Sequence, residues 1–198
     1  MAKYDNDIVP ELAPRAGNFI TRAIGEAILK VLGWKMVGSL PNEKKLIIVG
    51  APHTSNLDGI LAVACMLSVG LKFSFMMKKE MFVFPFGAFF KALGAIPIDR
   101  GAKKNMVEQM ADWFETHDKV WLGVTPEGTR KKVARYKKGY LYIAQAANVP
   151  VSLVGVNGHS KEVILGKVWT LTDDLDADNA AIKAYCDEHY SGVHPEKK

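Results

Sequence analysis

Residues 46–69 read LIIVGAPHTSNLDGILAVACMLSV, and their pattern indicates the fold class. It begins with a continuous apolar run at 46–50, which is typical of a strand buried on both faces. A polar loop follows, and then an apolar segment from about Leu57 to Val69 that is long enough for a helix. A buried strand that leads directly into a helix is the repeating unit of α/β proteins with parallel sheets.

The same alternation continues along the chain. Further strands are predicted at 72–77, 95–98, 119–124 and 149–156, and helices at 103–117, 139–148 and 176–190. The segment 80–93 predicts a helix bent by Pro85 and Gly87, and a hairpin-like pair is expected around Gly166. The sequence therefore predicts an α/β fold, with a largely parallel central sheet flanked by helices.

The N-terminal part differs from this pattern. Residues 1–14 predict an extended arm, and apolar residues recur at helical spacing from about Arg15 to Leu32, where Gly33 ends the pattern. This amphipathic helix has two interpretations: it packs on the body of the protein, or it lies in a membrane interface with Trp34 and Lys35 at its edge. We predict two parts, residues 1–40 (arm and amphipathic helix) and 41–198 (the α/β domain).

Composition and charge narrow the class of protein. The 198 residues are 48% apolar and 24% charged, which is ordinary for a globular chain. The net charge of +5 favours anionic partners such as phosphates or acidic lipid headgroups. Nucleic acid is not expected, because zinc-finger, RNP and basic-zipper patterns are absent. The two distant cysteines, Cys65 and Cys186, lack metal-ligand spacing, and with no secretory segment in view they predict a cytoplasmic protein.

Polar residues follow the predicted strands in APHTSNLD (51–58), IDRGAKK (98–104) and TPEGTR (125–130). Loops at the carboxyl ends of parallel strands are where such folds place their sites. In the first loop, His53 can take a proton from a hydroxyl while Asp58, five residues later, fixes its tautomer. The alternative is that Asn56 or Asp58 only caps the following helix.

The other two loops offer groups that bind anions. Arg100 has the fork geometry that suits a phosphate, although it could instead pair with Asp99. The third loop places a carboxylate, a flexible glycine, a hydroxyl and a guanidinium in succession, at Glu127, Gly128, Thr129 and Arg130. Such a set can hold a polyol hydroxyl and its phosphate together, and the alternative is a polar β-to-α turn. A basic segment, 131–138, follows.

In order and spacing, these blocks resemble the glycerolipid acyltransferases of the lysophosphatidic acid acyltransferase type. A histidine and an aspartate separated by four residues match His53 and Asp58. Gly-x-Ile ending in Arg matches Gly94, Ile96 and Arg100, and Pro-Glu-Gly-Thr-Arg is complete at 126–130. The resemblance covers about residues 45–156. The chain departs from the family at Pro52, where Asn is frequent, and after Val151, where a second proline is usual.

The resemblance implies that His53 is a general base and Asp58 its orienter, and that Arg100, Glu127, Gly128, Thr129 and Arg130 position the acceptor. It implies acyl-CoA or acyl-carrier protein as the acyl thioester donor and a lysophospholipid, 1-acylglycerol 3-phosphate, as acceptor, with no metal or cofactor. Peripheral contact with the cytoplasmic face of a membrane is a further expectation. The stretch 76–90, rich in Phe and Met, would line an acyl groove, dip into a bilayer, or form plain core.

Two other functions compete with this one. A serine hydrolase would use Ser55 or Thr54 as nucleophile beside His53, but the nucleophile-elbow pattern Gly-x-Ser-x-Gly is absent. A non-enzymatic phospholipid-binding module would keep the basic loops and would not need His53.

Overall fold

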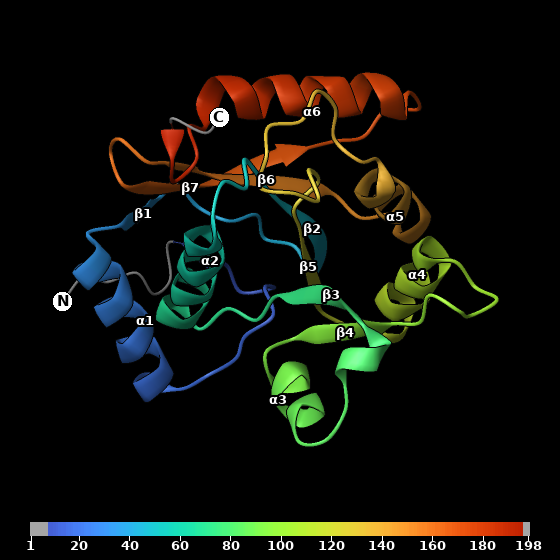
Figure 1. Ribbon diagram of the computed structural model, residues 1–198, viewed down its shortest axis with the longest axis horizontal. Helices are drawn as coiled ribbons and strands as arrows, with labels where there is room; N and C mark the ends of the chain where they lie inside the picture. Colours follow the sequence, from blue (N-terminus) through green and yellow to red (C-terminus); the bar gives the residue numbers. More distant parts are fainter. Residues whose placement is uncertain (1–7, 196–198) are drawn as a thin grey trace.

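A seven-stranded sheet between two layers of helices forms the body of the protein, as seen in a computed structural model described here for residues 8–195 (Figure 1). The strands lie in the order β1-β7-β6-β2-β5-β3-β4. Their bounds are β1 Lys35–Val37, β2 Lys45–Gly50, β3 Ser74–Lys78, β4 Ala95–Ile98, β5 Val120–Val124, β6 Val151–Asn157 and β7 Glu162–Trp169. The helices are α1 Phe19–Leu32, α2 Asn56–Val69, α3 Phe86–Ala92, α4 Met106–Thr116, α5 Gly139–Ala147 and α6 Leu175–His189.

Strands β6, β2, β5, β3 and β4 are mutually parallel. Strand β7 runs antiparallel to β6, and β1 runs parallel to β7 at the edge. The predicted fold class, a largely parallel sheet flanked by helices, is therefore confirmed. Parallel strands place their carboxyl ends at one edge of the sheet, so the loops after β2, β5 and β4 open on the same side.

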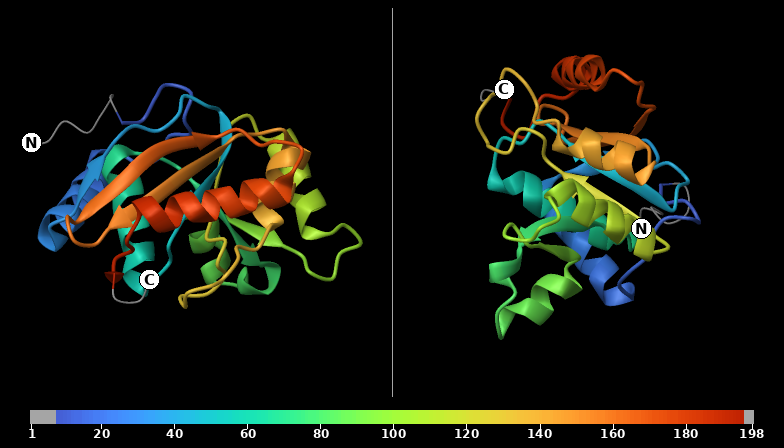
Figure 2. Two further views of the ribbon diagram at one scale, coloured as in Figure 1. Left: turned by 90° about the horizontal axis from the view of Figure 1, so that it is seen from above. Right: turned by 90° about the vertical axis from the view of Figure 1, so that its right-hand side faces the viewer.

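Each face of the sheet has its own apolar core. On one face, Ile47 and Val49 of β2 pack with residues of α4, α5 and α6. On the other face, Leu46 of β2 and Trp121 of β5 pack with α1, α2 and the chain at 8–13. Figure 2 shows α6 lying across β6 and β7. This alternation between two covered faces explains why the central strands are continuous apolar runs in the sequence.

Several elements differ from the sequence prediction. The segment 80–93 is not one bent helix: it divides into a short 3-10 helix at Lys79–Met81 and helix α3, with Pro85 between them. Gly166 lies inside β7 and not at a hairpin turn, since β6 and β7 are joined at residues 158–161. At Gly166 the φ angle is +99°, the pairing of β6 and β7 shifts by one residue, and Ser39 passes against it, so the glycine marks a bulge.

The N-terminal segment also differs in detail. Strand β1 was not predicted, and it adds residues 35–37 to the sheet from within the segment 1–40. Part of the predicted arm, 1–7, lies outside the described residues, while Ile8, Val9 and Ala13 are buried against the core. Helix α1 begins at Phe19, later than predicted, because Asn18 caps it in a capping box with Thr21.

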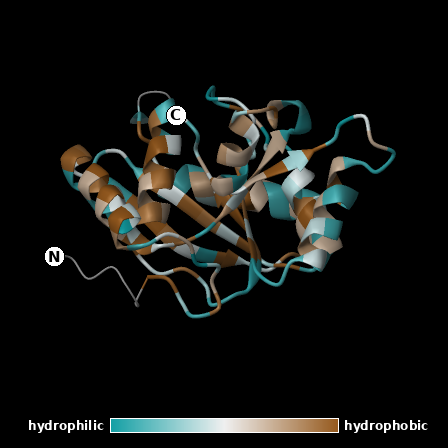
Figure 3. Cartoon of the chain, turned by 90° about the horizontal axis from the view of Figure 1, so that it is seen from below, coloured by the Kyte–Doolittle hydropathy of each residue, from teal (hydrophilic) through white to brown (hydrophobic). Residues whose placement is uncertain are grey.

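Helix α1 exposes apolar residues as well as burying them. Gly25 and Leu29 are buried, and the helix packs along α2. Ile20, Ile24, Ala27 and Val31 form an exposed apolar stripe, because their spacing of four, three and four residues places them on one side of the helix. The apolar colouring of α1 and α2 is visible in Figure 3. No helix within residues 8–195 is long and apolar enough to cross a bilayer.

Candidate active site

The loops that follow β2 and β5 meet at the carboxyl edge of the sheet, because these two strands are paired neighbours. The loop after β2 carries His53, and the loop after β5 carries Glu127 and Arg130. A small cavity between them is lined by residues of both loops, among them His53, Glu127 and Arg130. Two of the three motif loops are thus brought together.

His53 and Asp58 are in direct contact. The Nδ1 atom of His53 lies 3.0 Å from Oδ2 of Asp58, and both side chains are largely buried. A carboxylate at Nδ1 holds the imidazole in the tautomer with the proton on Nδ1, which leaves the Nε2 lone pair to accept a proton. The predicted pairing of these two residues is present in the structure.

Asp58 also caps helix α2. Its Oδ2 atom accepts hydrogen bonds from the backbone N–H groups of Thr54 (2.6 Å) and Ser55 (2.7 Å). Ser55 is the N-cap residue and accepts from the N–H of Leu57, which completes a capping box. The capping interpretation and the orienting interpretation of Asp58 therefore hold together, since one oxygen serves the helix and the imidazole.

Glu127 supports the same loop from the neighbouring strand. Its Oε1 atom accepts a hydrogen bond from the backbone N–H of His53 at 3.1 Å, and the residue is only 6% exposed. Burial raises the pKa of Glu127 above its ordinary value of 4.5, while the hydrogen bonds from its own N–H and that of His53 oppose this shift. Its Oε2 atom is buried without a hydrogen-bond partner among the described residues.

The rest of the 126–130 loop is a tight turn. Gly128 has a φ angle of +62°, and a Cβ atom there would lie 2.7 Å from Nζ of Lys137, so the glycine lets the lysine amine approach the backbone. The N–H of Lys137 donates to the carbonyl of Pro126, which closes the loop. Thr129 accepts from the N–H of Lys131, and Arg130 is exposed at the rim of the cavity.

Arg100 is not part of this cluster. It follows β4, the edge strand, which is three strands from β2 and therefore about 14 Å away at ordinary strand spacing. Asp99 pairs with Lys79 at 2.9 Å and not with Arg100. Within residues 8–195 the Arg100 side chain makes no hydrogen bond or ion pair, and it is exposed. The structure places Arg100 on the same edge of the sheet as His53 without joining it to the cavity.

Helix α6 contributes two residues to the cavity that sequence reasoning missed. Lys183 and Asp187 line it beside His53, and they form an ion pair with each other. The Nζ atom of Lys183 also lies over the ring of Tyr136, 5.6 Å from its centroid. No local motif marks these residues, because they come close to His53 only through the packing of α6 on β6.

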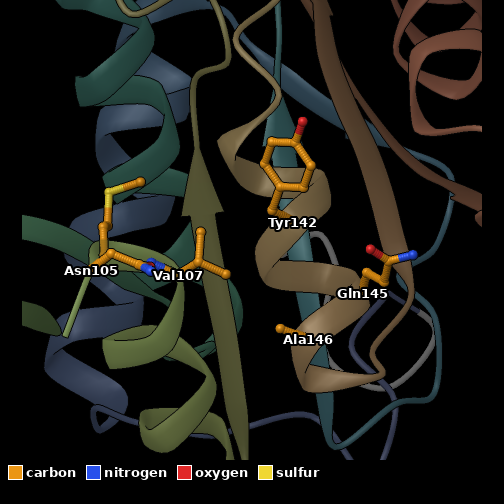
Figure 4. A pocket seen from close by; sticks show the side chains of 6 residues that line it. Asn105, Val107, Tyr142, Gln145 and Ala146 are labelled. Carbon is orange, nitrogen blue, oxygen red and sulfur yellow. The ribbon is translucent and has the colours of Figure 1, made fainter.

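A larger open groove runs between α4 and α5, with a volume of about 590 Å³ (Figure 4). Asn105 and Val107 come from the start of α4, and Tyr142, Gln145 and Ala146 come from α5. None of the motif residues lines this groove, and it contains no histidine, carboxylate or cation. The motif residues His53, Glu127 and Arg130 thus line the small cavity and not this groove.

The two hydroxyls that follow His53 take part in other hydrogen bonds, and both cysteine thiols have raised pKa values. The Ser55 hydroxyl oxygen caps α2, and the buried Thr54 hydroxyl oxygen accepts from the N–H of His194. Burial raises the pKa of both Cys65 and Cys186 to about 12, which keeps these thiols protonated. In the part of the chain that the structure describes, no group of three or more His, Cys, Asp or Glu side chains is placed to hold a metal ion.

A histidine–aspartate pair and a glutamate at adjacent strand ends of an α/β sheet suit an enzyme that activates a hydroxyl or a water. Residues 35–156 match the family model described as Acyltransferase. The chain belongs to this acyltransferase family, and the resemblance seen in its motifs is confirmed.

Curated relatives agree with this assignment over part of their length. The chain is 31% identical over 114 residues to the chloroplastic 1-acyl-sn-glycerol-3-phosphate acyltransferase BAT2 of Brassica napus, a match of 55% of this chain and 33% of the relative. It is 32% identical over 113 residues to the corresponding LPAT1 of Arabidopsis thaliana, a match of 53% of this chain and 32% of that protein. The chain thus spans about a third of the length of these relatives.

The fold agrees with a solved structure. The crystal structure of PlsC, the 1-acyl-sn-glycerophosphate (LPA) acyltransferase from Thermotoga maritima, superposes with a TM-score of 0.59 at 19% identity. The match covers 85% of this chain and 78% of that one. At this identity the likeness establishes the shared fold.

Proposed function

We propose that this protein is an O-acyltransferase that moves a fatty acyl group from acyl-CoA or acyl-carrier protein to a hydroxyl of a lysophospholipid in phospholipid biosynthesis. The acceptor we favour is 1-acylglycerol 3-phosphate, because the curated relatives are named 1-acyl-sn-glycerol-3-phosphate acyltransferases. The observation that carries the proposal is the contact between Nδ1 of His53 and Oδ2 of Asp58, 3.0 Å apart, at the edge of a cavity lined with cations.

The reaction needs no covalent intermediate with the protein. Nε2 of His53 takes the proton of the acceptor hydroxyl while the hydroxyl oxygen attacks the thioester carbonyl. The tetrahedral oxyanion collapses, the C–S bond breaks, and the leaving thiolate takes the proton back from His53. Asp58 stabilises the imidazolium that forms between these two steps.

The residues around His53 suit an anionic acceptor. Arg130, Lys131 and Lys132 line the cavity, where Lys183 is paired with Asp187, and the Lys137 amine lies over Gly128 beside it. The cavity itself, at about 30 Å³, has room for a group the size of a hydroxyl or one water molecule. We therefore place the reacting hydroxyl inside the cavity and the phosphate over the cationic rim. Arg100 would reach only a second, more distant anionic group of a substrate.

We also propose that the enzyme works at the cytoplasmic face of a membrane. Two surfaces support this: the exposed stripe of α1, where Val31 is 85% exposed, and the segment 81–89, where Phe84 is 97% exposed. Large apolar side chains exposed in this way are typical of membrane or protein contact. The net charge of +5 favours an anionic lipid surface. This arrangement would bring the site to its lipid substrate.

The test is a panel of acceptors offered to the purified protein with one acyl thioester. Lysophosphatidate, glycerol 3-phosphate, a lyso-aminolipid and a simple alcohol are compared, and products are identified by mass spectrometry. We expect acylated lysophosphatidate to dominate, with no need for added metal. Release of free fatty acid without any acylated acceptor would contradict the proposal and would favour the hydrolase.

A further inference from the structure

The chain beyond α6 turns back to the active-site loop. We call residues 190–195 the C-terminal strap. Tyr190 anchors its start: the residue is 1% exposed, and its N–H donates to the carbonyl of Cys186. Its ring lies flat against Gly155 of β6, where a Cβ atom would fall 2.1 Å from the ring carbon Cγ. Only a glycine at 155 lets the ring settle there.

The next residues of the strap are bound to the end of β6. The N–H groups of Ser191 and Gly192 both donate to the carbonyl of Val156, at 3.0 and 3.1 Å. In return, the N–H of Gly158 donates to the Ser191 hydroxyl at 2.9 Å. An isolated parallel bridge joins Gly192 to Asn157. The strap is therefore fixed to the same edge of the sheet that carries His53.

The strap then contacts the residues on either side of His53. The N–H of His194 donates to Oγ1 of Thr54 at 3.2 Å, and Thr54 is only 5% exposed. Gly192 has a φ angle of +77°, and a Cβ atom there would lie 2.6 Å from Cγ2 of Thr54 and 3.2 Å from Cγ of Pro52. Strap and loop are packed as closely as a missing Cβ atom allows.

We infer that the C-terminal strap is a positioning element for His53. Thr54 is held twice, by Asp58 through its N–H and by the strap through its hydroxyl, while Glu127 holds the N–H of His53. The strap lies outside residues 35–156, which match the family model, so this support comes from the chain's own C-terminal part. The effect of the strap on catalysis rests on the proposed function. Its effect on the order of the loop rests on the contacts alone.

The first test compares two glycine variants. Gly192→Ala drives a methyl group into Thr54, whereas Gly33→Ala, with a nearly equal φ of +73°, meets only the end of the Lys161 side chain at 3.4 Å. Both variants carry the strain of alanine at positive φ, so their difference isolates the contact. We expect Gly192→Ala to lose about 10- to 100-fold in kcat with little change in KM, because misplaced catalytic groups cost that much, and Gly33→Ala to keep its kcat.

A second pair of variants tests the same contact in case Gly192→Ala does not fold. Thr54→Val keeps the shape of the side chain and removes the acceptor for His194, while Thr54→Ser keeps the hydroxyl. Hydrogen exchange of the Thr54 and Ser55 amides, which donate to Asp58, reports on the order of the loop without any substrate. We expect faster exchange and lower kcat in Gly192→Ala and Thr54→Val than in Gly33→Ala and Thr54→Ser.

Unchanged exchange at Thr54 and Ser55 in Gly192→Ala and Thr54→Val would overturn the inference. So would faster exchange with an unchanged kcat, since the strap would then not position His53. If the unmodified protein acylates no acceptor in the panel, the proposed function fails. The exchange data alone then decide whether the strap orders the loop.

Discussion

The Asp58 carboxylate both orients His53 and caps α2. Comparing substitutions of His53 and of Asp58 can separate these two roles. It faces Nδ1 of His53 and also receives two N–H groups at the start of α2. Loss of a capping interaction costs about 0.5–2 kcal/mol, whereas loss of the group that orients the general base impairs a proton transfer worth about 10²- to 10⁴-fold in rate. A residue with both duties should therefore show both losses.

We predict that His53→Ala abolishes nearly all turnover with little change in the free energy of unfolding. Asp58→Ala should lose turnover and, in addition, about 1 kcal/mol of stability, because the N–H groups of Thr54 and Ser55 lose their acceptor in the capping box of α2. Initial rates of acyl transfer and urea unfolding of the same preparations measure the two effects. Equal stability losses in the two variants would show that Asp58 does not cap α2 in solution.

Glu127 predicts a pH dependence of stability. Its pKa in the folded state lies above the ordinary 4.5 because it is buried. The folded state therefore holds the proton more tightly than the unfolded chain, and the contribution of Glu127 is fully present below pH 4.5. It is lost as the pH rises through the folded pKa.

In Glu127→Gln this loss cannot occur. The free energy of unfolding of Glu127→Gln minus that of the unmodified protein should therefore increase with pH between about 4.5 and neutrality. Urea unfolding at several pH values measures this difference. A difference that is flat, or that falls with pH, would mean that burial does not raise the pKa of Glu127.

The residues of the site were predictable only in part. His53, Glu127 and Arg130 follow strands β2 and β5, and the motifs placed them at strand ends. Their meeting depends on the strand order, which the sequence does not state. The same order sets Arg100 apart on β4, and the return of α6 brings Lys183 beside Tyr136 without any local signal. Local pattern thus identifies the groups, and tertiary pairing decides which of them meet.

At the scale of elements, α1 and α2 are packed backbone to backbone. Gly25 of α1 is the point of contact: a Cβ atom there would lie 2.4 Å from the backbone N of Ser68 and 2.6 Å from the backbone O of Ala64. Neither atom is at the end of a flexible side chain, so the helices themselves would have to move apart.

We predict that Gly25→Ala destabilises the protein by about 1–3 kcal/mol, because overpacking outweighs the better helix propensity of alanine. Gly59→Ala in α2 is the matched control, since nothing lies within 4 Å of its Cβ position. That variant should be neutral or gain up to about 1 kcal/mol. Equal midpoints of urea unfolding for the two variants would exclude close packing at Gly25.

Most helices and strands were predictable because the central strands and α2 are continuous apolar runs, and the other helices have an apolar side at helical spacing. Strand β1 escaped prediction because it has only three residues and takes its pairing from β7. The break before α3 follows from Pro85. The sequence shows the proline but not the residue at which the helix begins again. The sequence predicts a hairpin-like pair around Gly166, although its positive φ angle belongs to a bulge within β7. A glycine in the sequence indicates an unusual backbone angle, but the neighbouring strands decide whether that angle forms a turn or a bulge.

On the scale of the whole molecule, two exposed apolar surfaces occur together with a positive net charge. Helix α1 and the 81–89 segment lie along the lower part of Figure 1. Their apolar side chains and the net charge of +5 predict binding to vesicles that contain anionic lipid.

We predict that Ile24→Glu and Phe84→Glu each weaken sedimentation with phosphatidylglycerol vesicles. Val168→Glu, an equal change of charge at an exposed residue of β7, should have a much smaller effect. Added salt should weaken binding of all variants, because part of the attraction is electrostatic. Loss of binding in Val168→Glu equal to that in Ile24→Glu would show that charge alone governs the interaction.

The hydrogen bond from His194 to Thr54 spans 140 residues of sequence, and this has a consequence for biosynthesis. A chain is made and folds from its N-terminus, so the loop with His53 leaves the ribosome long before the residues that hold it. If the strap orders that loop, a growing chain carries every motif of its family but not the finished site. Acyl transfer would reach its full rate only after residue 194 has been made and has folded back onto the loop, so a partly made chain would acylate its substrate slowly.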